Sequence, residues 1–221
     1  MMFNSSGDKL HDYVFVAGAP GSKWSSVVKN IYYSESVDRT DYSEDRIYEH
    51  SAWGQPEEMH IGAYFDPGME FGKKFLRMSH QTKQENTKEF DRPFYGTGTK
   101  LIRSHVFCHQ LDYLRETWPE VPIVLVYRSN DACLGWWARC GHFNITYPNY
   151  QYYSNLEMMG MHIDKQNEDM LDFMVRHFQV FDVQDSNDLA RRLNLDPCHE
   201  NDPQIYARDD IKVCVVMPDA L

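Results

Sequence analysis

Residues 12–26 read DYVFVAGAPGSKWSS, and this stretch decides the fold. Residues 12–17 are mostly apolar, β-branched or aromatic, and the sequence Gly-Ala-Pro-Gly at 18–21 stops the run abruptly. A buried parallel strand that enters a tight loop has this pattern. After the loop, apolar residues recur at the three-and-four spacing of a helix, at Trp24, Val27, Val28 and Ile31. We therefore predict a strand, a glycine-bearing loop and a helix that ends near Tyr33.

Two more strands are expected near the middle of the chain. Residues 99–105, TKLIRSH, predict a strand that carries His105 at its end. Residues 123–127, IVLVY, form a continuous apolar run, which is typical of a central parallel strand covered on both faces. A last strand is expected at 212–217, and helices at 107–118, 132–140, 155–161, 167–181 and 187–193. Strands that alternate with helices predict a three-layer α/β/α fold with a mostly parallel central sheet.

The chain is expected to be a single domain over residues 1–221, because this length suits one packed core and no flexible linker divides it. Between residues 35 and 95 the periodicity breaks down into a polar stretch rich in Asp, Glu, Tyr and His. We expect an irregular insertion with short helices, one of them near residues 70–78. Long, weakly structured segments inside compact domains are more often functional than idle, so the insertion is expected to contact substrate.

Composition and charge argue against several classes of function. The net charge of -11 disfavours a nucleic-acid partner, since such proteins normally present a basic face. No apolar run approaches the roughly 20 residues of a membrane span, and the first residues lack the pattern of a secretory signal. Five cysteines without the density of a disulfide scaffold suggest reduced thiols in the cytoplasm. They lack the paired short spacing of a zinc site, so no metal is expected.

The loop at residues 18–26 has the composition of a phosphate site. Glycines such as Gly21 let backbone N–H groups converge on an anion, and the start of the following helix adds the positive end of its dipole. Lys23 supplies a full positive charge, and the hydroxyl donors are Ser22, Ser25 and Ser26. The loop is not a Walker motif, which requires Gly-Lys followed directly by Ser or Thr, because Ser22 precedes Lys23 and Trp24 follows it.

The loop and two later segments resemble the P-loop sulfotransferase family. The family's 5′-phosphosulfate loop reads roughly Pro-x-Ser-Gly-Thr-Thr, and the residues that match it or nearly do are Pro20, Ser22, Ser25 and Ser26, with Lys23 in the glycine place. Residues 100–105, KLIRSH, resemble the family's strand that ends in Lys-Thr-His. Residues 122–131, PIVLVYRSND, resemble its 3′-phosphate motif, a hydrophobic strand that ends in Arg. The resemblance covers about half the chain and is nearer to divergent microbial or phage members than to the animal enzymes.

This resemblance implies an enzyme that transfers a sulfuryl group from 3′-phosphoadenosine 5′-phosphosulfate to a hydroxyl or amine of a small-molecule or glycan acceptor, without a metal. His105 matches the family's catalytic base, and Lys23 would act on the transferring group. Arg128 would bind the 3′-phosphate, and the rest of the donor site would be Pro20, Gly21, Ser22, Lys23, Trp24, Ser25 and Ser26. The sequence departs from the family at several points. The proline after the arginine is absent and the motif is one residue shorter, and Gly135 and Trp136 stand where the 3′-phosphate serine falls. A glycine-rich, basic C-terminal segment of the kind that completes the family's 3′-phosphate site is also missing.

Other interpretations of the same residues stay open. The loop is also similar to that of nucleotide kinases, Gly-x-Pro-Gly-Ser-Gly-Lys, without the glycine before the lysine, and it also fits a plain turn with an exposed Lys23. His105 also fits a core histidine bonded to a backbone carbonyl, and Arg128 a surface pair with Asp131. The departures from the family pattern fit a non-catalytic nucleotide-binding member as well. The sequence does not identify the acceptor.

Overall fold

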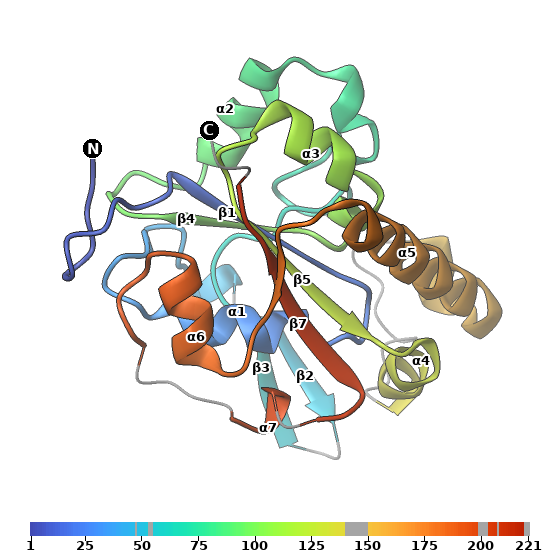
Figure 1. The fold of residues 1–221 in the computed structure, drawn as a ribbon. Helices are drawn as coiled ribbons and strands as arrows, with labels where there is room; N and C mark the ends of the chain where they lie inside the picture. Colours follow the sequence, from blue (N-terminus) through green and yellow to red (C-terminus); the bar gives the residue numbers. More distant parts are fainter. Residues whose placement is uncertain (47, 53–54, 140–149, 199–202, 207, 219–221) are drawn as a thin grey trace.

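The computed structural model describes residues 1–46, 48–52, 55–139, 150–198, 203–206 and 208–218. Within these residues the chain forms a five-stranded sheet in the order β4-β1-β5-β7-β6 and a separate two-stranded hairpin (Figure 1). The strands of the main sheet are β1 (Tyr13–Gly18), β4 (Lys100–Arg103), β5 (Ile123–Arg128), β6 (Val180–Asp182) and β7 (Ile211–Val216). The four strands predicted from apolar runs are thereby confirmed, and β6 is additional.

The sheet is mixed, so the prediction of a mostly parallel sheet is wrong. β1 pairs in parallel with β4 on one side and with β5 on the other, but β7 runs antiparallel to both of its neighbours. β7 follows β6 in the chain and enters the sheet between β5 and β6. Its apolar run correctly predicts a buried strand. The same run fits either direction, because a strand buried on both faces carries no directional signature.

Helices pack on both faces of this sheet. They are α1 (Trp24–Tyr32), α2 (Lys83–Asp91), α3 (Leu111–Thr117), α4 (Asn130–Arg139), α5 (Leu156–Arg176), α6 (Ser186–Arg192) and α7 (Pro203–Tyr206). Side chains alternate along a strand, so Val14 and Val16 of β1 pack with α1, α6 and α7, whereas Phe15 and Ala17 pack with α2, α3 and α5. α4 contributes to a third cluster that reaches Ala19, the first residue after β1.

The insertion at residues 35–95 is more ordered than the sequence predicts. It contains the 3₁₀ turns η1 (Glu44–Arg46) and η2 (Phe75–His80), the hairpin β2 (Tyr48–Ala52) and β3 (Gln55–His60), and α2. The helix expected near residues 70–78 is the turn η2, displaced toward His80. α2 begins with a capping box, in which Thr82 Oγ1 accepts from the Glu85 amide and the Glu85 carboxylate accepts from the Thr82 amide. The Thr-x-x-Glu pattern of this box is a signal that the sequence does carry.

The sequence predicts two helices between residues 155 and 181, separated by the mostly polar residues 162–166. The structure has one continuous helix, α5. Gln166 is buried and contacts His105, so its polar side chain faces the interior of the protein rather than solvent. The end of the second predicted helix is replaced by the short edge strand β6.

Other boundaries differ by a few residues. The helix expected at 107–118 is the 3₁₀ turn η3 (His105–His109) followed by α3. α4 starts before the predicted helix does, and the predicted end of that helix, Cys140, lies outside the described residues. The cap of α6 is Asp185, whose carboxylate accepts from a backbone amide of the first turn. No helix in the described part of the chain is long and apolar enough to cross a membrane.

Candidate functional site

The three segments singled out by the sequence meet at one edge of the sheet. β1 lies between β4 and β5, and all three run in the same direction, so their carboxyl ends lie side by side (Figure 1). The loop 19–23 follows β1, Ser104 and His105 follow β4, and Ser129 follows β5. The chain passes from β1 to β4 on one side, then back across β1 to β5. Such a switch point, at the carboxyl ends of parallel strands, is where ligands bind in open α/β sheets.

The loop makes a tight turn whose shape depends on Gly21. The backbone is left-handed at Gly21 (φ 84°) and at Lys23 (φ 70°), and the Ser22 amide donates to the Ala19 carbonyl over 3.0 Å. A Cβ atom at Gly21 would lie 2.4 Å from the carbonyl oxygen of Cys133 in α4. Glycine is therefore required here both for its conformation and for the close approach of the two backbones.

The hydroxyl groups of the loop differ in their surroundings. Ser22 is fully buried, and its Oγ has no hydrogen-bond partner among the described residues. Ser25 is buried and Ser26 is half-buried, both in the first turn of α1. A buried hydroxyl without a partner is costly. Ser22 is thus a group that can donate a hydrogen bond to an anion held by the loop, whereas the buried Pro20 contributes only shape.

Lys23 and Trp24 both contact aromatic rings. The Lys23 ammonium lies 3.2 Å from the ring centroid of Trp136, a cation–π contact. Trp24 is buried and stacks on Tyr64 of the insertion, with 5.6 Å between ring centroids. Lys23 is half-buried, so the alternative of a plain turn with an exposed lysine does not describe this loop. The cation–π contact holds a positive charge beside the loop.

The Arg128 side chain is buried and is held by hydrogen bonds to other residues of the protein. Its side chain is 2% exposed, its Nε donates to the Asp210 carboxylate over 2.8 Å, and its Nη1 donates to the Gly21 carbonyl over 3.0 Å. The partner is Asp210 rather than Asp131, which is exposed on α4. Arg128 therefore ties the phosphate loop to the segment just before β7, a role that the sequence does not predict.

His105 lies in a buried polar cluster. Its Nδ1 is 3.0 Å from the amide nitrogen of Gln166, and its Nε2 is 3.3 Å from Oδ2 of Asp66. Ser104 donates to the other carboxylate oxygen of Asp66, and the Tyr64 side chain also hydrogen-bonds to this carboxylate. The rings nearest to His105 are those of Tyr150, Tyr152 and His162. His105 is thus buried, as the alternative interpretation expects, but side chains rather than a backbone carbonyl orient its ring.

Replacing Asp66 with asparagine is expected to flatten the pH dependence of stability. Burial raises the pKa of Asp66 to about 7, against the hydrogen bonds that Ser104 and Tyr64 donate, whereas its ordinary value is 3.8. Between these values the folded protein keeps a proton that the unfolded chain has released. Stability therefore falls as pH rises through this window, by at most about 1.4 kcal/mol per pH unit. Urea unfolding across the window measures the slope, and an unchanged slope in Asp66→Asn would exclude Asp66 as its source.

Several residues of the site come from segments that the sequence leaves unassigned. Asp66 belongs to the insertion, and so does Asp41, which accepts from the Tyr32 hydroxyl (2.9 Å) and from the Ala63 amide (2.8 Å). Arg103, at the end of β4, donates to the Ala63 carbonyl over 3.2 Å. The insertion is thereby fixed to α1 and to the carboxyl edge of the sheet. Sequence spacing gives no signal for these contacts, because the partners belong to different elements and lie 9 to 40 residues apart along the chain.

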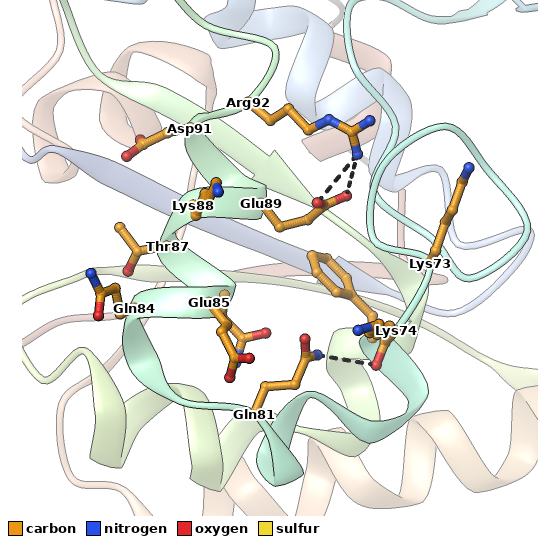
Figure 2. Close-up of a pocket in the computed structure, with 12 residues that line it drawn as sticks. Lys73, Lys74, Gln81, Gln84, Glu85, Thr87, Lys88, Glu89, Asp91 and Arg92 are labelled. Carbon is orange, nitrogen blue, oxygen red and sulfur yellow. Dashed lines mark hydrogen bonds and ion pairs between the residues drawn. The ribbon is translucent and has the colours of Figure 1, made fainter.

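A cavity of about 860 Å³ lies elsewhere, beside α2. Figure 2 shows Glu89 and Arg92 paired on one side of the helix, across from Lys73. The acidic groups of the lining have protein partners: Glu85 caps α2, Glu89 accepts from the Gly72 amide, and Asp91 pairs with Lys100. The cavity is not lined by the loop, His105 or Arg128, so it is separate from the candidate site.

Among the described residues, no group of three His, Cys, Asp or Glu side chains is arranged to hold a metal ion. The described side chains of the candidate site are a buried hydroxyl (Ser22), a lysine (Lys23), a buried arginine (Arg128) and a histidine–carboxylate pair (His105 and Asp66). Comparisons of the chain with protein-family models, with curated proteins and with solved structures give no match.

Proposed function

We propose that this protein transfers a sulfuryl group from 3′-phosphoadenosine 5′-phosphosulfate to a hydroxyl or amine of a small-molecule or glycan acceptor. One observation carries the proposal: the loop, His105 and Arg128 lie at the carboxyl ends of three adjacent parallel strands, at one edge of the sheet. These are the segments that resemble the sulfotransferase family. Helices on both faces of the sheet support the three-layer P-loop type of fold for this domain. Free thiols at Cys108, Cys133, Cys198 and Cys214 support a reducing compartment such as the cytoplasm.

The proposed reaction forms one bond and breaks one. The acceptor oxygen or nitrogen attacks the sulfur, the bond from sulfur to the bridging phosphate oxygen breaks, and 3′-phosphoadenosine 5′-phosphate leaves. The first turn of α1, the Ser22 hydroxyl and the Lys23 ammonium would stabilise the charge that develops on the leaving phosphate. The Gln166 amide donates to Nδ1 of His105, so the neutral ring carries its proton on Nε2, which faces Asp66. The acceptor proton would pass to Nδ1 once the Gln166 side chain releases it, and Asp66 would stabilise the resulting imidazolium.

A second candidate is a nucleotide-binding protein of the same fold without catalysis. The burial of His105 favours it, because only 2% of the side chain is exposed and both ring nitrogens face protein groups. A base in this position reaches an acceptor only if the cluster of Tyr150, Tyr152 and His162 rearranges. Nucleotide binding is common to both candidates, so it is tested first.

The bisphosphate product, 3′-phosphoadenosine 5′-phosphate, is expected to bind without metal and to raise the melting temperature by mass action. Lys23→Ala is expected to weaken this binding about tenfold to a hundredfold, the loss of about one charge-assisted hydrogen bond. Lys29→Ala, at the other end of α1, serves as the matched control. Isothermal calorimetry measures the affinity of the wild-type protein and of both variants for the bisphosphate. Binding of ATP with magnesium, and none of the bisphosphate, would instead place the protein among the kinases.

A further inference from the structure

We infer that the donor site binds the 5′-phosphate end of the nucleotide and makes no favourable contact with a 3′-phosphate. This inference rests on the proposed function and specifies which part of the donor the site recognises. It assigns Arg128 the role of a positioning residue for the loop instead of a ligand for the 3′-phosphate. Adenosine 5′-phosphosulfate would then serve as donor as well as its 3′-phosphorylated form.

The first support is the state of Arg128. Its side chain is almost fully buried, and its guanidinium donates hydrogen bonds to the Asp210 carboxylate and to the Gly21 carbonyl. To bind a phosphate it would have to leave its ion pair with Asp210, a half-buried carboxylate, and release the Gly21 carbonyl that it holds in the turn. The loss of this charge-assisted hydrogen bond to the loop is unfavourable. The guanidinium that would bind the 3′-phosphate is therefore the same group that holds the turn at Gly21 in place.

The second support is the negative charge of Asp210. Hydrogen bonds from Arg208 and from Arg128 hold the pKa of Asp210 well below its ordinary value. Nε and Nη2 of Arg208 lie 2.8 and 3.0 Å from the two carboxylate oxygens. A 3′-phosphate placed at Arg128 would face this ionised carboxylate at short range. Like charges at such distances repel, so Asp210 offsets part of the attraction that Arg128 and Arg208 would exert on a 3′-phosphate at this position.

The third support comes from α4, the helix that follows β5. The position that the family pattern gives to a phosphate-binding serine is occupied here by Gly135 and Trp136. Glycine has no donor side chain, and the Trp136 ring is engaged by the Lys23 ammonium. The Trp136 ring therefore contacts the Lys23 ammonium and offers no hydroxyl to a second phosphate.

The test compares adenosine 5′-phosphate with 3′-phosphoadenosine 5′-phosphate by isothermal calorimetry. The wild-type protein is expected to bind the two within about threefold of each other. Asp210→Asn removes the opposing charge while keeping the shape, so it should favour the bisphosphate over the monophosphate by about tenfold, the gain of one charge-assisted hydrogen bond. Asp182→Asn, which removes a carboxylate of β6 that is paired with Lys212 of the neighbouring strand β7, should leave the ratio unchanged.

The measured affinities distinguish a failure of this inference from a failure of the proposed function. A wild-type protein that binds the bisphosphate at least tenfold more tightly than the monophosphate overturns this inference and leaves the proposed function intact. A protein that binds neither nucleotide overturns both. If Asp210→Asn does not fold, the wild-type ratio alone remains decisive, because it is measured on the unmodified chain.

Discussion

Replacing His105 with alanine is expected to lower the rate constant of sulfuryl transfer by about a hundredfold to ten-thousandfold, the usual contribution of a general base. Nucleotide affinity should change little, since His105 belongs to the acceptor side of the proposed site. The histidine is also part of a buried network with Asp66 and Gln166. Its removal should therefore lower the free energy of unfolding by about 1–3 kcal/mol, because it leaves polar partners unsatisfied.

Two measurements on the same variant separate the catalytic role from the structural one. Turnover is expressed per folded molecule, and the free energy of unfolding comes from urea titration. His109→Ala is the matched control, since His109 lies in the same 3₁₀ turn and pairs with Asp169 at 2.6 Å, outside the Asp66 cluster. If stability falls while turnover per folded molecule holds, His105 is structural, and the non-catalytic candidate or another base takes its place.

Replacing Gly21 with alanine is expected to destabilise the protein by about 2–5 kcal/mol. About 1–2 kcal/mol comes from placing a Cβ on a residue with φ of 84°. The remainder, about 1–3 kcal/mol, comes from the overlap of that Cβ with the Cys133 carbonyl, which stands 2.4 Å away. The loop must move off α4 to relieve the overlap, so the hydrogen bond from Arg128 to Gly21 should weaken as well. Thermal or urea unfolding measures the loss.

Gly135→Ala is the matched control for this prediction. A Cβ at Gly135 meets no atom within 4 Å, and the residue lies inside α4. Alanine there should stabilise the protein by up to about 1 kcal/mol, since glycine is the poorer helix former. If both variants were equally stable, the loop would not be packed against α4 as the distances indicate.

Much of the fold is determined by local sequence. The apolar runs at 13–17, 123–127 and 212–216 correspond to β1, β5 and β7, and the spacing after the first run gives α1. These signals are local because a strand buried on both faces needs a continuous apolar run and a helix needs a period of 3.6. The direction of β7 is different, since it depends on where the last strand enters a sheet that is already formed, and no residue of the run encodes it.

The candidate site likewise has a part that the sequence predicts and a part that depends on tertiary contacts. The positions of the loop, His105 and Arg128 at strand ends could be predicted, because parallel strands share one carboxyl edge. Their partners could not, since Asp210 lies 82 residues from Arg128, and Gln166 lies 61 residues from His105. Asp66 comes from an insertion whose polar composition predicts irregular structure and gives no register. The sequence by itself thus determined which groups stand at the sheet edge. Only the tertiary structure decided that Arg128 is neutralised by Asp210 and that His105 is buried against Asp66, because charge pairing and burial depend on contacts between distant segments.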